Sequence, residues 1–280
     1  MREIEAKTIT EAVKKLCIDA CYYLNDEILD AFRKCKEKEE SPVAVDILSQ
    51  LEENARISRE GQFPLCQDTG FAVLFVELGA DVVIKGGTLP EAINEGVRQG
   101  YTEGYLRKSI VSDPLERKNT GDNTPAALHL EIVPGDKLKI TILPKGGGSE
   151  NMSEVRMLKP ADGAKGVIDF VLERVSKAGP NPCPPIVVGV GIGGTFEMAA
   201  LIAKKALLRP LGSRNPKPHL AAIEEELIER INHMGIGPQG FGGRCTALAV
   251  HVEAYPCHIA SLPAAVNIEC HSHRHKEIVL

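Results

Sequence analysis

Apolar residues in the first sixty positions recur at spacings of three and four residues. They form one stripe over residues 9–28 and a second over residues 45–55. Because an amphipathic helix repeats about every 3.6 residues, residues 1–60 are predicted to be helical. Cys17 and Cys21 lie four positions apart on the first stripe. We expect both to be core residues, since a reduced cysteine packs as a small hydrophobe.

Beyond residue 70 the apolar positions form short runs and alternating pairs. FAVLFVEL (71–78) is typical of a buried strand. LHLEIV and KLKITIL alternate on either side of Pro134-Gly135-Asp136, which predicts a hairpin. Further strands are predicted over residues 186–190, 246–255 and through Val266 and Ile268, and helices over residues 90–107, 162–177, 195–208 and 220–234. The expected fold class is mixed α/β: a helical N-terminal segment packed on an α/β core with a mixed sheet, in a single domain over residues 1–280.

The composition narrows the class of protein. The chain is 43% apolar and 25% charged, which is enough to bury a core and excludes a disordered chain. Its net charge of −5 comes from interspersed charges, so neither a nucleic-acid surface nor an anionic-membrane surface is expected. No apolar run approaches the roughly 20 residues of a membrane span, and MREIEAKTIT lacks the apolar core of a signal peptide. We therefore expect a soluble, cytoplasmic protein.

Eight cysteines in such a chain need an explanation. Without an export signal they are expected to be reduced, which favours metal binding or catalysis over disulfides. No C-x-x-C occurs, so neither a thioredoxin-type dithiol nor a simple zinc ribbon is indicated.

Three cysteines lie in polar loops. Cys66 is followed by Gln67 and Asp68, which could hold a metal and its substrate, although a loop with capping residues would have the same sequence. Cys183 lies between prolines, in a stiff loop that suits a metal ligand or an inert thiol. Cys270 is followed by the histidine run HSHRH (271–275), which could be a set of metal ligands but is expected to be frayed surface at the chain end.

Two glycine-rich segments suggest other chemistry. Gly189, Gly191 and Gly194 match G-x-G-x-x-G, but no acidic residue for a ribose lies about twenty residues further on. A tight structural turn is the favoured interpretation, and a nucleotide-binding module built on GVGIGG stays an alternative. LPKGGGSEN (143–151) offers successive backbone amides that could bind a carboxylate, with Arg107 in the preceding polar segment.

Taken together, seven segments resemble one family in order along the chain. They are PLCQDTG, DPLERKNTGDNTPAALH, PKGGGSEN, CPPIVVGVGIGGT, GPQGFGG, CHIASLP and AAVNIEC. They are similar to the N-terminal region of the iron–sulfur (class I) fumarate hydratases and L-tartrate dehydratases. The resemblance implies that Cys66, Cys183 and Cys270 hold a [4Fe–4S] cluster whose fourth iron is open to substrate.

The resemblance also implies roles for neighbouring residues. Asp68 is implied as a catalytic proton partner. Gln67, Arg107, Gly147 and His258 are implied to bind the substrate, a small dicarboxylic acid.

The chain ends at Leu280, where single-chain members of the family continue. It therefore looks like the α subunit of the two-subunit form, which needs a β subunit for turnover. The reversible hydration of fumarate to malate is the expected reaction, with L-tartrate dehydration as the alternative. A structural or regulatory zinc protein using the same thiols is the remaining hypothesis.

Overall fold

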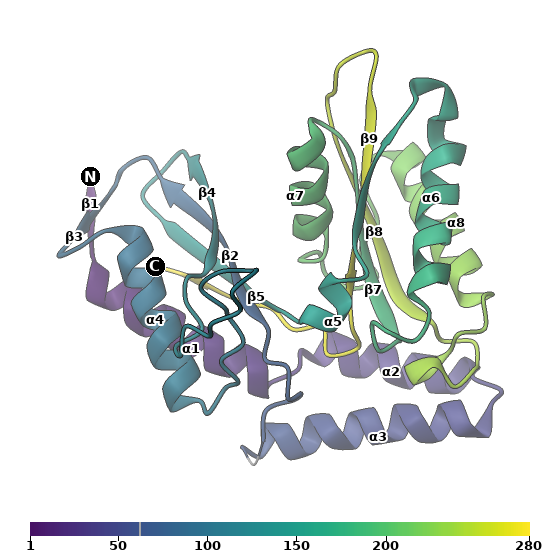
Figure 1. Cartoon of the computed structure of the whole chain (residues 1–280), viewed down its shortest axis with the longest axis horizontal. Coiled ribbons are helices and arrows are strands. Elements are labelled where there is room, and N and C mark those ends of the chain that lie inside the picture. The colour runs from purple at the N-terminus through teal and green to yellow at the C-terminus, as the bar shows by residue number, and fades with distance from the viewer. Residues whose placement is uncertain (62) are drawn as a thin grey trace. The chain divides into compact units, whose positions relative to one another are not determined.

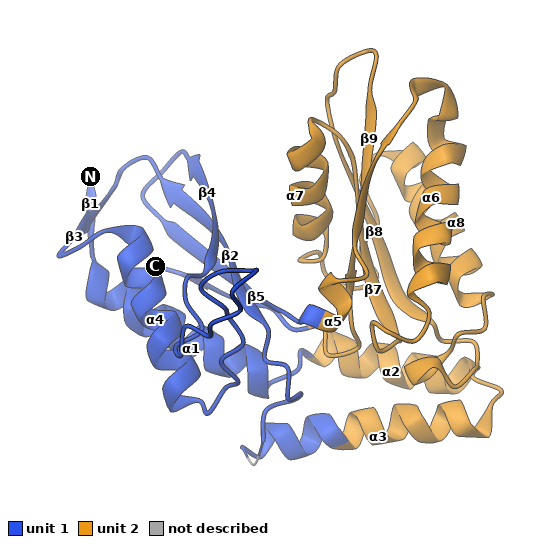
Figure 2. Cartoon of the chain, in the orientation of Figure 1, with its two compact units in different colours: residues 1–25, 54–147, 274–280 blue, residues 26–53, 148–273 orange. Residues whose placement is uncertain are grey.

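The structure is a computed structural model that describes residues 1–61 and 63–280. The chain divides into two compact units, each discontinuous in sequence (Figure 2). Unit 1 comprises Met1–Asn25, Asn54–Gly147 and Arg274–Leu280, and unit 2 comprises Asp26–Glu53 and Gly148–His273. The mixed α/β class expected from the sequence is confirmed. The single domain over residues 1–280 stays a prediction, because compactness alone does not define what folds independently.

Unit 1 is built on a four-stranded mixed sheet with the strand order β10-β5-β2-β4 (Figure 1). The strands are β2 (Phe71–Gly79), β4 (Ala127–Val133), β5 (Leu138–Lys145) and β10 (Lys276–Val279). Strand β2 is apolar on both faces and takes a central position, as expected for a strand with so little exposed surface. Helices α1 (Ala6–Tyr22) and α4 (Leu89–Glu103) pack together and join the core of this sheet.

The expected hairpin over residues 128–143 is wrong in its pairing. Both strands form, but β2 lies between them, parallel to β4 and antiparallel to β5. The connecting turn is instead attached to the end of β2: Gly79 N donates to Lys137 O at 2.8 Å and Asp81 N donates to Gly135 O at 2.9 Å. The alternation of apolar and polar residues predicts each strand correctly, but it does not predict which strand pairs with which. Here the pairing follows from the central, buried position of β2, the most apolar strand. A short parallel pair, β1 (Arg2–Glu5) with β3 (Val82–Lys85), completes the unit's strands among the described residues.

The N-terminal helices follow the two predicted stripes, but the prediction of helix over residues 1–60 is wrong for Arg2–Glu5, which forms the strand β1. The first stripe divides into α1 and α2 (Asp26–Lys38), and the second becomes α3 (Pro42–Arg59). Cys17 and Cys21 are fully buried in α1, as predicted. No helix within residues 1–61 and 63–280 is both long and apolar enough to cross a membrane.

Unit 2 is built on a second four-stranded mixed sheet, with the order β6-β9-β7-β8. Its strands are β6 (Glu154–Leu158), β7 (Ile186–Gly193), β8 (Ala247–Tyr255) and β9 (Leu262–Glu269). Helices α6 (Gly163–Ala178) and α8 (Pro218–Asn232) cover one face of this sheet, and α7 (Phe196–Ala206) covers the other (Figure 1). The predicted helices and strands of this region are thus present.

The alternation of valine with glycine in β7 is explained by what packs on the two faces of the strand. Val188 and Val190 belong to the core that α6 and α8 cover. A Cβ at Gly189 would lie 2.1 Å from Ala203 O, and one at Gly191 would lie 2.2 Å from Ala199 O. These glycines let α7 lie directly against the strand. They lie inside β7 rather than in a strand-to-helix turn, so both the tight turn expected there and the dinucleotide fingerprint are wrong for these two positions.

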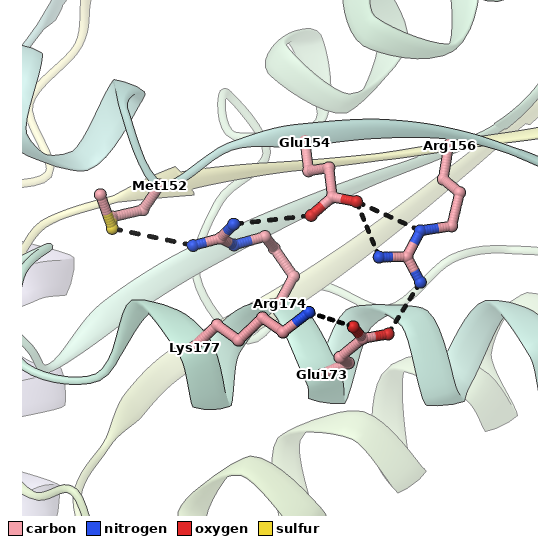
Figure 3. Close-up of polar contacts among 6 residues, drawn as sticks. All are labelled: Met152, Glu154, Arg156, Glu173, Arg174 and Lys177. Atoms are coloured by element: carbon pink, nitrogen blue, oxygen red, sulfur yellow. Dashed lines mark hydrogen bonds and ion pairs between the residues drawn. The ribbon is translucent and has the colours of Figure 1, made fainter.

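A network of charged side chains attaches the edge strand β6 to α6 (Figure 3). Arg156 forms ion pairs of 2.7 Å with Glu154 on its own strand and with Glu173 on α6. Arg174 also reaches Glu154, and Lys177 pairs with Glu173. Hydrogen bonds from Arg156 and then Lys177 lower the pKa of Glu173 to about 2. Such charges also protect an exposed sheet edge from pairing with another strand.

The expectation that all cysteines are reduced is wrong for one pair. Cys35 on α2 and Cys245 before β8 form a disulfide with a Cα–Cα distance of 5.9 Å. The two residues are 210 positions apart. Their sequence context gives no sign of the pairing, because it depends on α2 packing beside the start of β8.

Candidate functional site

The segment before β2 forms a turn in which the backbone carbonyls of Asp68, Thr69 and Gly70 accept hydrogen bonds from side chains. Tyr101 OH donates to Thr69 O at 2.8 Å and to Gly70 O at 3.0 Å. The buried Arg274 donates to Asp68 O. Asn123 Nδ2 adds a bond to Gly70 O at 3.2 Å. Buried donors from three distant segments therefore fix the backbone on which Cys66, Gln67 and Asp68 are carried.

Asp68 is held at both oxygens by backbone amides. Gly70 N donates to Oδ1 at 3.0 Å, and Gly147 N donates to Oδ2 at 2.8 Å. Each carboxylate oxygen has a second lone pair, so the side chain can still accept a bond from a substrate hydroxyl. Thr69 Oγ1 donates to Arg107 O at 3.2 Å, which attaches the Arg107 backbone to the same turn. Unit 1 thus brings Asp68, Gly147 and Arg107 together.

The side chains of Cys66 and Gln67 are accessible on this turn. Cys66 is half-buried and Gln67 is exposed. The Asp68 N–H lies 3.4 Å from Cys66 Sγ, and the Cys66 thiol lies 3.5 Å from Gln67 Oε1. A sulfur that accepts a backbone N–H is suited to a thiolate, the form in which cysteine binds metal.

The other two candidate ligands lie at one end of the sheet in unit 2. Cys183 precedes β7 and Cys270 follows β9, and these strands are antiparallel, with Val187 opposite Glu269. His271 N donates to Cys183 O at 3.2 Å, so the two cysteine-bearing loops are in direct contact. Cys183 is exposed and has a φ of 55°, a left-handed conformation that a non-glycine residue adopts only where its surroundings enforce it.

The six cysteines outside the disulfide fall into two chemical groups. Cys17 and Cys21 are buried, and burial raises the pKa of both thiols, that of Cys21 to about 11. They remain protonated and inert. Cys66, Cys183 and Cys270 are accessible and lie at strand ends, whereas Cys257 is exposed at the opposite end of the unit 2 sheet. Accessible thiols at strand ends are suitable donors for an iron–sulfur cluster or for zinc.

A complete metal site is not present within either unit. Cys66 lies in unit 1, while Cys183 and Cys270 lie in unit 2. Among residues 1–61 and 63–280, no group of three or more His, Cys, Asp or Glu side chains is arranged to hold a metal ion. The three cysteines are of a residue type and an accessibility that suit thiolate ligands of a metal cluster.

Of the two expectations for histidines, the one for His258 stays open and the one for the run after Cys270 is wrong. His258 is exposed in the loop between β8 and β9, at the far end of β9 from Cys270. The substrate-binding role of His258 stays a prediction. The run after Cys270 is not frayed: Ser272, His273 and Arg274 are buried, and the chain continues into β10.

Sequence reasoning missed the residues that hold the site from behind. Arg274 lies within the histidine run HSHRH, and the sequence analysis considered only the histidines of that run. Asn123 is fully buried, with a φ of 63°, and its Oδ1 accepts a bond from Ser109 N at 2.7 Å. The roles of Arg274 and Asn123 depend on contacts between distant segments. The only sequence signal for Asn123 is its place in the polar segment TGDNTP (120–125).

The family of the chain follows from comparison with known proteins. The family model for fumarate hydratase (Fumerase) matches residues 10–279, so the chain belongs to the fumarate hydratase family and is a hydro-lyase. It is 42% identical over 275 residues to the putative L(+)-tartrate dehydratase subunit alpha of Methanocaldococcus jannaschii, covering 95% of each chain. It is 33% identical over 270 residues to the L(+)-tartrate dehydratase subunit alpha of Escherichia coli K12, covering 95% of this chain and 88% of the relative.

Proposed function

We propose that the chain is the α subunit of a two-subunit iron–sulfur hydro-lyase that dehydrates L-tartrate. The observation that carries the substrate assignment is the set of curated relatives, which are named as L(+)-tartrate dehydratase α subunits and match nearly the full length of both chains. The family description, in contrast, is compatible with the fumarate–malate pair. The sequence alone favoured fumarate, and the named relatives support the tartrate alternative better.

Cys66, Cys183 and Cys270 are the proposed ligands of a [4Fe–4S] cluster. Support comes from their accessibility, from their strand-end positions and from the inert character of the buried thiols. When bound, such a cluster with three thiolate ligands supplies an iron that acts as a Lewis acid toward a substrate oxygen.

The remaining residues are proposed to bind the dicarboxylate and to handle a proton. Arg107, which is exposed and attached through its backbone to the catalytic turn, is suited to bind a substrate carboxylate. Gln67 presents an exposed amide beside Cys66. Asp68, fixed by two amides, is proposed to exchange a proton with the departing hydroxyl group. Gly147 contributes by orienting that carboxylate.

A β subunit is the proposed partner. The relatives are named as α subunits, which implies a second subunit in those enzymes. In this proposal the β subunit supplies the base that removes the proton from the adjacent carbon, so the α chain alone holds a cluster without turnover.

The test uses the anaerobically prepared complex of the chain with its β subunit. Loss of water from L-tartrate gives oxaloacetate, and loss of water from malate gives fumarate, so the two products are distinguished directly. The proposal predicts a kcat/KM for L-tartrate at least tenfold above that for malate. The reverse ratio would transfer the assignment to fumarate and malate. Turnover of neither substrate by a complex with an intact cluster would refute both.

A further inference from the structure

We infer that Gln239 is a positioning residue that fixes the Cys183 loop against the Cys270 loop, and thereby controls how firmly the cluster is retained. The inference rests on the proposed cluster function. Gln239 acts through its bonds to Pro184 and His271, the residues that follow the two cysteines.

Gln239 lies in a glycine-rich loop of unit 2, within the short 3-10 helix Pro238–Gly240. Its φ is 52°, in the left-handed region that is costly for a residue with a Cβ. Gly237 and Gly240 also have a positive φ, which costs a glycine little. For a glutamine the same conformation is unfavourable by itself. Its conformation is therefore explained by the contacts that its amide groups make.

Those contacts join the two ligand loops. The backbone N–H of Gln239 donates to Pro184 O at 2.8 Å, and so does its side-chain Nε2, also at 2.8 Å. The same Nε2 lies 3.0 Å from His271 Nδ1. Pro184 follows Cys183 directly, and His271 follows Cys270 directly. One side-chain amide thus bridges the residues adjacent to both proposed ligands.

Gln239 Nε2 can donate to His271 Nδ1 in the tautomer of the ring that has its proton on Nε2. A glutamine amide has two N–H groups, which then serve Pro184 O and His271 Nδ1. The backbone N–H of His271 meanwhile donates to Cys183 O at 3.2 Å. His271 Nδ1 also lies 3.1 Å from Cys183 O, so the His271 ring contacts both the Gln239 amide and the Cys183 loop.

The Gln239 loop is itself anchored on its other side. Glu39, between α2 and α3, accepts bonds from Arg244 N at 2.7 Å and Cys245 N at 3.2 Å through one carboxylate oxygen. The Cys35–Cys245 disulfide attaches the same end of the loop to α2. Gly240 packs so closely on Pro180 that a Cβ there would lie 2.3 Å from the proline Cβ. The Gln239 loop therefore has little freedom to shift if the Gln239 bridge is removed. Removal should instead loosen the Cys183 and Cys270 loops relative to each other.

The test compares Gln239→Ala and the isosteric Gln239→Glu with the wild-type chain. Glutamate keeps the size but replaces the bridging N–H groups with an oxygen that faces Pro184 O. The full chain, reconstituted anaerobically with iron and sulfide, is mixed with a ferrous chelator, and the first-order rate of iron release is measured. Visible-range circular dichroism reports the cluster's surroundings independently of activity. Both variants are expected to release iron at least tenfold faster than wild type and to alter the dichroism.

Two controls separate positioning from general destabilisation. Gln50→Ala removes an exposed helical glutamine that bonds only Asp46 among the described residues, and it should leave the rate unchanged. Val190→Ala destabilises the core of unit 2 without touching either loop, and it should lower the melting temperature while changing the release rate less than threefold. The inference is overturned if Gln239→Ala and Gln239→Glu release iron at the wild-type rate, or no faster than Val190→Ala. Absence of iron in the wild-type chain itself would refute the proposed function instead.

Discussion

The sheets of the two units have the same strand directions, position for position. In the orders β10-β5-β2-β4 and β6-β9-β7-β8, the first two pairs are antiparallel and the last pair is parallel. Strands β2 and β7 therefore occupy equivalent positions. Each follows a loop that carries a candidate cysteine, and each begins beside the end of an antiparallel neighbour, β5 or β9.

The equivalent ends carry different chemistry. In unit 1, Cys66 shares its end of the sheet with the Asp68 carboxylate, the Gly147 amide and Arg107. In unit 2, Cys183 meets a second cysteine, Cys270, through the bond from His271. In the proposed function, the same arrangement of strands offers mainly substrate-binding and proton-transferring groups in one unit and mainly metal ligands in the other. Function here is decided by the loops rather than by the sheets.

The largest effect is expected at the catalytic end of unit 1. Asp68→Asn keeps the acceptor for one backbone amide but removes the group that can take a proton. We expect kcat of the holoenzyme to fall about 10²–10⁴-fold, the usual contribution of a general acid or base. Iron and sulfide content should stay at the wild-type level. A wild-type kcat would remove Asp68 from the chemistry, and loss of iron would show that it supports the cluster instead.

Unit 2 alone contains the cross-link between Cys35 and Cys245. Because it closes a loop of about 210 residues, the chain-entropy model assigns it about 5 kcal/mol, and measured losses are typically about 2–5 kcal/mol. Cys35→Ser should therefore speed amide hydrogen exchange in β7 far more than in β2. Cys257→Ser, which removes an exposed thiol of the same unit, is the control and should change neither. Equal acceleration in both sheets would contradict the assignment of the cross-link to unit 2.

A smaller effect is expected from the glycines of β7. Gly189→Ala would place a Cβ against the backbone of α7, and overpacking of this kind costs about 1–3 kcal/mol. At Gly148 a Cβ would have its nearest neighbour at 3.8 Å, so Gly148→Ala should be tolerated. Denaturant unfolding of both variants checks the difference. Equal stabilities would mean that α7 can move away from the strand without cost.

The last prediction, with the smallest effect for each step in conditions, is a pH dependence of the stability of unit 2. His251 on β8 is buried, and burial, followed by the charge of Arg209, lowers its pKa to about 4. In the unfolded chain its pKa is about 6.5, so between these values the unfolded state binds one more proton. The free energy of unfolding should thus fall by up to about 1.4 kcal/mol for each pH unit lowered from about 6.5 toward 4. Unfolding curves at several pH values should show this slope, and His251→Gln should reduce it by that amount. An unchanged slope would mean that another group titrates.

Local patterns predicted the elements well, but contacts between distant segments did not follow from them. The cysteine-bearing turn before β2 was visible as a motif, yet its partner Gly147 lies 79 positions from Asp68. The hairpin was mispaired because alternation does not reveal that β2 lies between its strands. Neither the Cys35–Cys245 bond nor the support from Arg274 leaves a local signal. His258 was assigned by resemblance alone, and the sheet places it at the other end from Cys270.

The central proposal is that Cys66, Cys183 and Cys270 are the ligands of one iron–sulfur cluster. The most direct measurement is iron and acid-labile sulfide per chain after anaerobic purification, for the wild type and for Cys66→Ser, Cys183→Ser and Cys270→Ser. Cys257→Ser is the matched control. The account predicts near-equal iron and sulfide in the wild type and the control, with loss in all three ligand variants. Wild-type iron in any of the three, or zinc without sulfide in the wild type, would contradict it.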